Sequence, residues 1–140
     1  MQTATIRWDG GERFAATTPS THSLLLDSDR ESNTGPGPME LLLAALGACT
    51  ATDVVIILAK KRQKLETLEV SVSGERAADP PRVWTTLEVV FRVRGRNEAG
   101  GPIEEKAVAD AIRLSEEKYC SVAAMLRKTA VLSVRYEILT

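Results

Sequence analysis

The segment that most limits how this chain can fold is an almost uncharged run between Glu40 and Lys60. Leucine, alanine, valine and isoleucine occupy every face of the helix that this run would form, up to the basic cluster Lys60–Arg62. A helix with one apolar stripe can lie on a protein surface, whereas a helix that is apolar all round has to be enclosed. Pro38 suits the first helical turn and Glu40 suits the positive end of the helix dipole. The sequence therefore predicts a long helix buried in the middle of the molecule.

The length and the apolar content of the chain bear on its domain organisation and its compartment. The longest apolar stretch, Leu41–Thr52, is shorter than the roughly 20 residues needed to cross a bilayer. The start of the chain, Met1–Trp8, lacks the features of a secretory signal. A chain of 140 residues with 44% hydrophobic content can bury one core of its own. We therefore expect a single domain over residues 1–140 that is cytoplasmic and does not associate with membranes.

The remaining elements are predicted from shorter patterns. Two runs around Gly10 and Gly11 indicate an N-terminal hairpin, and a third strand is expected from His22 to Leu26. Apolar and polar residues alternate over 68–73, 87–94 and 132–138, which indicates three further strands; helices are expected over 103–118 and from Cys120 to about Lys128. The predicted order is β-β-β-α-β-β-α-α-β. Strands grouped around helices without regular alternation indicate an α+β fold with antiparallel sheets around the central helix.

The balance of charges and of metal-binding side chains excludes several classes of function. The 18 basic and 19 acidic residues give a net charge of -1 and are spread along the whole chain. No basic surface is expected that could hold a phosphate backbone, so nucleic acid is not an expected partner. Two cysteines and one histidine cannot supply the four ligands of a structural zinc site. A reducing compartment also argues against a permanent disulfide.

The two cysteines lie in different helical settings. Cys49 is inside the nearly uncharged helix, where a cysteine is usually inert packing, and Cys120 opens a second helix. The unpaired backbone N–H groups at a helix start favour a thiolate. One thiol of each kind suggests a redox pair that the fold assembles. The alternative is two buried structural thiols, since free cysteine is among the most buried residue types.

Two motifs around these cysteines resemble the OsmC/Ohr family, named for osmotically inducible protein C and organic hydroperoxide resistance protein. The first is Pro38-Met-Glu-Leu-Leu-Leu-Ala-Ala-Leu-Gly-Ala-Cys49, and the second is Glu117-Lys-Tyr-Cys120-Ser-Val. The similarity spans nearly the whole chain, and it is closest to a less characterised branch that has Pro-Met-Glu where the peroxidases have Pro-Glu. The resemblance implies an intertwined homodimer whose long central helices lie together and whose two active sites form between the subunits.

The resemblance also implies a chemistry for the two thiols. In the family's peroxidases the first cysteine attacks a hydroperoxide, and the second resolves the sulfenic acid as a disulfide. Carried over to this chain, the resemblance implies that Cys49 attacks an organic hydroperoxide and that Cys120 resolves the Cys49 sulfenic acid. A small or protein-borne dithiol then regenerates the pair. No metal, haem or flavin is implied.

The residues around Cys49 depart from the peroxidase pattern. In the peroxidases a carboxylate directly after the proline orients an arginine that holds the cysteine as a thiolate, and here that position is Met39. The next carboxylate is Glu40, and one step along a helix rotates a side chain by roughly 100°. Glu40 therefore either orients an arginine or is only a helix-start charge. Arg30 is the preferred arginine and Arg13 the second candidate, although either could be an ordinary solvated charge.

Three further features bear on function, and one of them, Asp53, motivates a second hypothesis together with Met39. Asp53 lies one helical turn after Cys49, and a nearby negative charge raises the pKa of a thiol. His22 could act as a base, but a lone histidine in a strand is more often a surface residue. Trp8, Trp84 and Tyr119 could line an apolar pocket or belong to the core. The second hypothesis is a non-catalytic OsmC-like binding protein with a small-molecule pocket at the dimer interface, and the third is a structural domain without a pocket.

Overall fold

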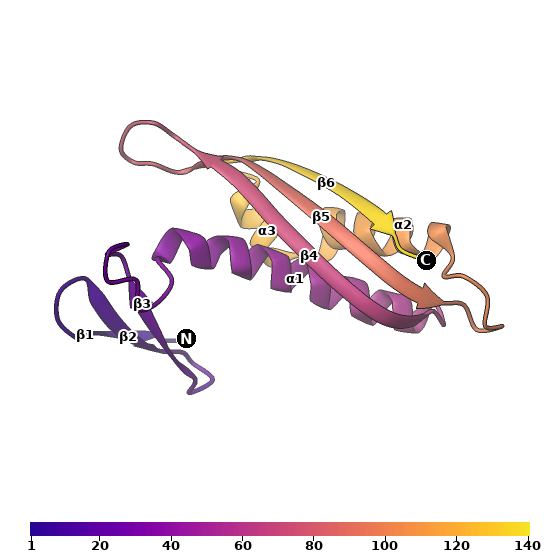
Figure 1. Cartoon of the computed structure of the whole chain (residues 1–140), viewed down its shortest axis with the longest axis horizontal. Coiled ribbons are helices and arrows are strands. Elements are labelled where there is room, and N and C mark those ends of the chain that lie inside the picture. The colour runs from indigo at the N-terminus through magenta and orange to yellow at the C-terminus, as the bar shows by residue number, and fades with distance from the viewer. The chain divides into compact units, whose positions relative to one another are not determined.

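The computed structural model describes all 140 residues and contains the following elements (Figure 1): β1 (Thr5–Trp8), β2 (Arg13–Thr17), β3 (Ser23–Asp27), α1 (Pro38–Lys60), β4 (Lys64–Arg76), β5 (Trp84–Arg96), α2 (Glu105–Leu114), the π-helical turn η1 (Ser115–Tyr119), α3 (Ser121–Leu126) and β6 (Val131–Ile138). This order confirms the predicted α+β fold, with one π-helical turn added between the last two helices. The chain divides into two compact units, Met1–Leu42 and Leu43–Thr140, which are described in turn.

The N-terminal unit is built on a three-stranded antiparallel sheet in the order β1-β2-β3. Trp8 is opposite Phe14 at the first turn, and Gly10 and Gly11 adopt φ values of 88° and 54° there. Such positive φ angles suit glycine because it has no Cβ. The predicted hairpin is confirmed, and the third strand lies one residue later than expected.

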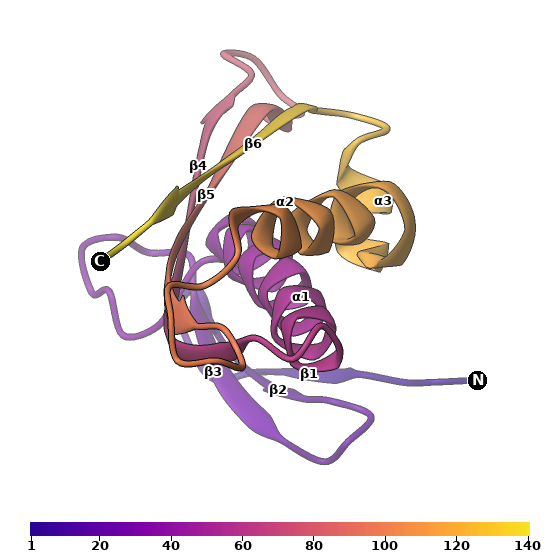
Figure 2. The ribbon, with the colours of Figure 1, turned by 90° about the vertical axis from the view of Figure 1, so that its right-hand side faces the viewer.

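The C-terminal unit contains a second sheet in the order β4-β5-β6. Strands β4 and β5 form a long antiparallel hairpin, whereas β5 and β6 are parallel. The prediction of purely antiparallel sheets is therefore wrong for this pair. The physical reason is the connection, because α2, η1 and α3 carry the chain back along the sheet before β6 starts. Figure 2 shows these helices and α1 on the same side of the sheet.

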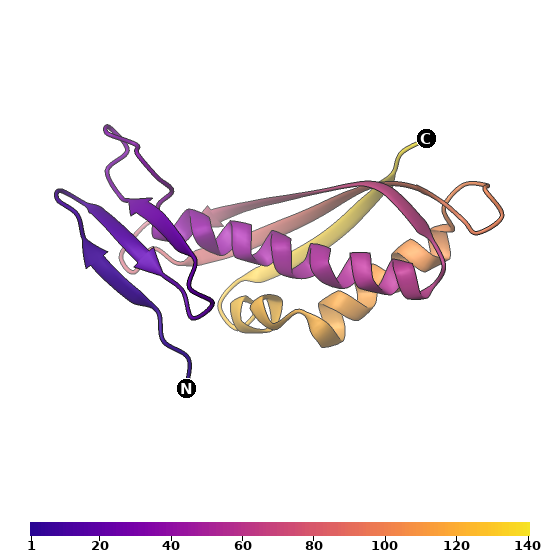
Figure 3. The ribbon, with the colours of Figure 1, turned by 90° about the horizontal axis from the view of Figure 1, so that it is seen from below.

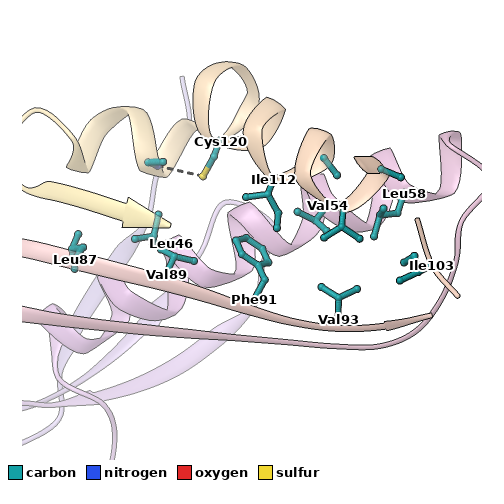
Figure 4. Close-up of a cluster of buried hydrophobic side chains, with 14 of the residues drawn as sticks. Leu46, Val54, Leu58, Leu87, Val89, Phe91, Val93, Ile103, Ile112 and Cys120 are labelled. Atoms are coloured by element: carbon teal, nitrogen blue, oxygen red, sulfur yellow. Dashed lines mark hydrogen bonds between the residues drawn. The ribbon is translucent and has the colours of Figure 1, made fainter. Parts of the chain in front are cut away.

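The core of the C-terminal unit lies between the sheet and its helices. The inward-facing residues of β5 are those that the alternating pattern predicts: Leu87, Val89, Phe91 and Val93 are all buried. They pack against residues of the helices, among them Leu46, Val54, Leu58, Val108, Ala111 and Ile112 (Figure 4). Every second residue of a strand points to the same face, which is why this period of two locates the core.

Helix α1 is buried along one face only in the single chain, so the prediction that it is enclosed on all sides is wrong for one copy. Leu46, Val54 and Leu58 are fully buried, whereas Val55 and Ile56 on the opposite face are 44% and 48% exposed. The helix is also longer than the apolar stretch suggested: at 23 residues it could cross a membrane by length and composition alone. It is a core helix of this unit, and Figure 3 shows it running along the strands of the sheet.

Candidate thiol site

Cys49 lies at the boundary between the two faces of α1. It is partly exposed and packs against the edge of the core cluster. The neighbouring positions Ala48 and Thr52 are exposed, and Leu46 and Thr50 are buried. Since each residue turns a helix by about 100°, Cys49 falls between these two groups. Cys49 is therefore a partly exposed residue at the rim of an exposed apolar face.

Cys120 is the N-cap of α3 and is only 3% exposed. Its Sγ atom accepts a hydrogen bond from the backbone N–H of Ala123 at 3.3 Å, which is the dashed line in Figure 4. Its own backbone N–H donates to the carbonyl of Ser115 at 2.9 Å and so closes the π-helical turn. Both bonds hold the cysteine in place at the junction of η1 and α3.

The fold brings the two cysteines together as a pair of free thiols. The Cys49 thiol acts directly on that of Cys120. Burial first, and then the neighbouring Cys49 thiol, raises the pKa of Cys120 to about 11, while the N–H of Ala123 acts in the opposite direction. The expectation that the helix start favours the Cys120 thiolate is wrong on balance, because desolvation of the charged form outweighs one backbone donor.

The protonation of Cys120 divides the chemistry between the two sulfurs. With a pKa of about 11, Cys120 carries its proton at neutral pH and can donate it in a hydrogen bond to the Cys49 sulfur. Two neighbouring thiols can also form a disulfide after local adjustment. The arrangement is suited to one attacking and one resolving thiol.

Asp53 occupies the position that the helical spacing predicts, one turn after Cys49. Its carboxylate accepts a hydrogen bond from Ser115, with Oγ and Oδ2 2.8 Å apart. The Coulomb effect of this carboxylate adds to the rise in the pKa of Cys120. Ser115 was not among the expected site residues. The signal for it was its place on the apolar face of the helix predicted over 103–118, together with Val108, Ala111 and Ile112.

Arg30 and Glu40 lie together in the N-terminal unit. Arg30 Nη1 is 3.6 Å from Glu40 Oε2, and the same guanidinium donates to the carbonyls of Asp27 and Gly35. Glu40 also accepts a hydrogen bond from the backbone N–H of Gly37 at 2.9 Å. The carboxylate that follows Met39 is therefore engaged both with the helix start and with the arginine.

The loop that carries Arg30 is wound around a fully buried carboxylate, that of Asp27. This carboxylate accepts hydrogen bonds from the hydroxyl and backbone N–H of Thr34, from the hydroxyl of Ser32 and from the backbone N–H of Asp29. The bonds from Thr34 come first among the causes that hold the pKa of Asp27 well below its ordinary value. The sequence showed only a loop rich in turn-forming residues at this place.

The other candidates make local contacts within the N-terminal unit. Arg13 donates to the carbonyl of Asp9 at 3.3 Å in the first hairpin turn. His22 Nδ1 is 2.9 Å from the hydroxyl of Ser20 on the surface. Trp8 is exposed in this unit. None of these contacts indicates a reactive group.

Comparison with known proteins gives consistent results across sequence and structure. The family model described as OsmC-like protein matches residues 31–135. Protein YhfA of Escherichia coli K12 is 40% identical over 135 residues, which is 96% of both chains. A hypothetical protein from Aquifex aeolicus VF5 has a crystal structure with a TM-score of 0.86 at 30% identity, covering 99% of this chain and 96% of that one.

A more distant structure links the fold to proteins named for peroxide resistance. The organic hydroperoxide resistance protein OhrB of Bacillus subtilis has a TM-score of 0.69 at 14% identity, with 98% of each chain covered. At that identity the similarity concerns the fold. The matched family model and the YhfA relative carry the assignment: this chain belongs to the OsmC-like protein family.

Proposed function

We propose that this protein is a thiol-dependent peroxidase that reduces organic hydroperoxides. The observation that supports it most is the pair of interacting free thiols, in which a partly exposed Cys49 meets a buried, protonated Cys120. Proteins of the same fold that are named for organic hydroperoxide resistance add support from a distance. We place the reaction in the cytoplasm, where dithiol reductants are available.

In the proposed reaction the Cys49 thiolate attacks one oxygen of the O–O bond. The S–O bond forms as the O–O bond breaks, the alcohol leaves with a proton, and Cys49 becomes a sulfenic acid. The Cys120 sulfur then attacks the Cys49 sulfur, so that a disulfide forms and water leaves with the Cys120 proton. A small or protein-borne dithiol reduces the disulfide and restores both thiols.

Arg30 is the cation that we propose for stabilising the Cys49 thiolate, with Glu40 as the residue that orients it. The support is the contact between Arg30 and Glu40 and the carbonyls that hold the guanidinium. An arginine that is already held by several acceptors loses little entropy when it binds an anion. Replacing Arg30 by methionine should therefore slow the reaction of Cys49 more than replacing Arg13 does.

We also propose that the active form is a homodimer. The support is the exposed apolar face of α1, which contains Leu42, Ala45, Ala48, Val55 and Ile56. A second copy that covered this face would remove apolar side chains from water at the rim where Cys49 lies. Cys49 would then be close to the interface, where an apolar substrate can be enclosed.

The decisive experiment measures consumption of cumene hydroperoxide by the purified protein with dithiothreitol as reductant. Wild-type protein should consume the peroxide, and Cys49→Ser should abolish turnover while the fold is retained. Cys120→Ser should still form one sulfenic acid per chain, which dimedone traps and mass spectrometry detects. A Cys49→Ser protein with wild-type turnover would refute the assignment.

A non-catalytic binding protein is the second candidate, and one observation favours it. Asp53 lies one turn from Cys49, takes part in none of the ion pairs of the molecule, and would disfavour a thiolate nearby. This candidate predicts that a small apolar fluorophore binds equally well to wild-type protein and to Cys49→Ser, without peroxide consumption by either. Turnover that depends on Cys49 would exclude it.

A further inference from the structure

Ser115 connects the carboxylate of Asp53 to the backbone of Cys120. Its hydroxyl donates to Asp53 Oδ2 at 2.8 Å, and its carbonyl accepts the backbone N–H of Cys120 at 2.9 Å. The first bond joins α1 to the π-helical turn, and the second bond closes that turn. Ser115 is only 1% exposed, so both bonds are inside the protein. A single residue thus ties the acidic side chain to the segment that presents the second thiol.

The link lies in a π-helical turn. Such turns are rare and occur frequently at functional sites. A buried serine could instead have bonded to the carbonyl one turn earlier in its own helix. Here the hydroxyl of Ser115 bonds to a carboxylate on another helix, which fixes that carboxylate beside the thiol pair.

The charges that face the thiols leave Asp53 as an uncompensated negative group. On η1 and α3, Glu116 and Arg127 pair with each other at 3.6 Å, and Arg127 also donates to the Glu116 carbonyl. The sheet contributes apolar side chains beside Ser115, namely Phe91, Leu132 and Val134. On α1 the titratable groups here are Cys49 and Asp53 themselves. Of the two cations here, Arg127 directly after α3 is engaged by Glu116, and Lys118 on η1 lies over the ring of Tyr119.

We propose that Asp53, held by Ser115, is a positioning residue that keeps Cys120 in its protonated form beside Cys49 until Cys49 has been oxidised. The proposal rests on the proposed function only in taking Cys49 as the thiol that reacts first. A protonated Cys120 can donate a hydrogen bond to the Cys49 sulfur, whereas two thiolates would repel each other. The negative charge of Asp53 adds to that repulsion and so opposes the loss of the Cys120 proton.

Oxidation of Cys49 makes it easier for Cys120 to lose its proton. Among the causes that raise the pKa of Cys120 are the hydrogen bond and the Coulomb effect of Cys49. The Coulomb effect disappears when Cys49 becomes a sulfenic acid or a mixed disulfide, because its sulfur is then uncharged. Burial and the charge of Asp53 remain, so the resolving step keeps a rate that depends on Asp53. That rate is the measurable quantity.

The test follows disulfide exchange with 5,5′-dithiobis(2-nitrobenzoate) and needs no peroxide. Cys49 attacks the reagent, forms a mixed disulfide and releases one nitrothiobenzoate anion, which absorbs in the visible. Cys120 then attacks the Cys49 sulfur, which forms the internal disulfide, releases a second anion and gives the Cys120 proton to solvent. Wild-type protein should show two phases and Cys120→Ser only the first, so the second phase reports Cys120 alone.

Asp53→Asn keeps an acceptor for Ser115 and removes the charge, whereas Ser115→Ala keeps the charge and removes the bond. We expect Asp53→Asn to accelerate the second phase about threefold for each unit by which the pKa of Cys120 falls. The thiolate fraction then rises tenfold, and the lower nucleophilicity of the weaker base offsets about a factor of three. Ser115→Ala should show no acceleration. Asp110→Asn on α2, where Asp110 pairs with Lys106, is the matched control and should behave as wild type.

The outcomes separate this proposal from the proposed function. The proposal is supported if Asp53→Asn alone accelerates the second phase, even if no peroxide is consumed. The rate of that phase should still rise with pH between neutral and alkaline values, in parallel with wild type. Equal rates in Asp53→Asn and wild type, a slower Asp53→Asn, or acceleration in both variants would overturn it. Near-ultraviolet circular dichroism checks that each variant is folded. If Asp53→Asn is not, Asp53→Glu, which restores the charge, should match wild type, and an accelerated Asp53→Glu would overturn the proposal.

Discussion

The exposed face of α1 allows a sharp test of the proposed homodimer. The perturbation is the double substitution Val55→Glu and Ile56→Glu, which places two carboxylates on that face. Neither side chain belongs to the core cluster of the C-terminal unit. Glutamate is at least as good a helix former as valine or isoleucine, so α1 itself should not be weakened. The substitution therefore acts on association and leaves the fold of one copy intact.

The magnitude follows from the exposed fractions of the two side chains, 44% for Val55 and 48% for Ile56. Complete burial of such a side chain contributes about 1.5–3 kcal/mol, so covering the exposed half contributes about 1 kcal/mol each. A twofold dimer contains each side chain twice, which gives about 4 kcal/mol in total. At 1.4 kcal/mol for each factor of ten, the dimer Kd should rise about a thousandfold. Burying unpaired carboxylates would add to this loss.

Sedimentation velocity and light scattering after size exclusion give the mass directly. Wild-type protein should be a dimer, and the double variant should be a monomer with an unchanged far-ultraviolet circular dichroism spectrum. Val131→Glu is the control, because Val131 is 75% exposed at the start of β6 and the substitution adds a carboxylate away from α1. A double variant that stays folded and dimeric at wild-type concentrations would refute the assignment of this face to the dimer interface.

The remaining predictions concern stability. Cys120→Ala should lower the free energy of unfolding by about 1 kcal/mol more than Cys120→Ser, because serine restores a good N-cap acceptor for α3; urea titrations compare the two. The depressed pKa of Asp27 contributes stability that is complete above its ordinary value of 3.8 and is lost as the pH falls below that value. Thermal melts from pH 5 to pH 2 should show this loss in wild type, whereas the melting temperature of Asp27→Asn should depend less on pH. Gly74→Ala should be more destabilising than Gly47→Ala, by about 1 kcal/mol or more in Tm-based comparisons. A Cβ at position 74 would lie 2.7 Å from the backbone carbonyl oxygen of Thr86, whereas a Cβ at position 47 would lie 3.2 Å from a methyl group of Val72. Similar melting temperatures would contradict this reasoning.

The elements that could be predicted from the sequence are those whose pattern repeats. Strand β5 illustrates this, since four alternating residues placed its inward face correctly although the strand extends further at both ends. The parallel pairing of β5 with β6 could not be predicted, because periodicity carries no information on strand direction. The η1 turn was also missed. In this turn Ser115 bonds to Asp53 on a different helix, and local sequence propensity carries no information on such a contact.

The sequence by itself determined which side chains are apolar at which spacing. This was enough to place Cys49 on a long apolar helix, Cys120 at a helix start and Asp53 one turn after Cys49. Only the tertiary structure decided the protonation of Cys120, because desolvation depends on the segments that pack around it and one N–H donor is the weaker effect. The same holds for the face of α1 that stays exposed. A single sheet covers one side of a helix, so the sequence could show that both sides are apolar, whereas the fold decided which side remains open.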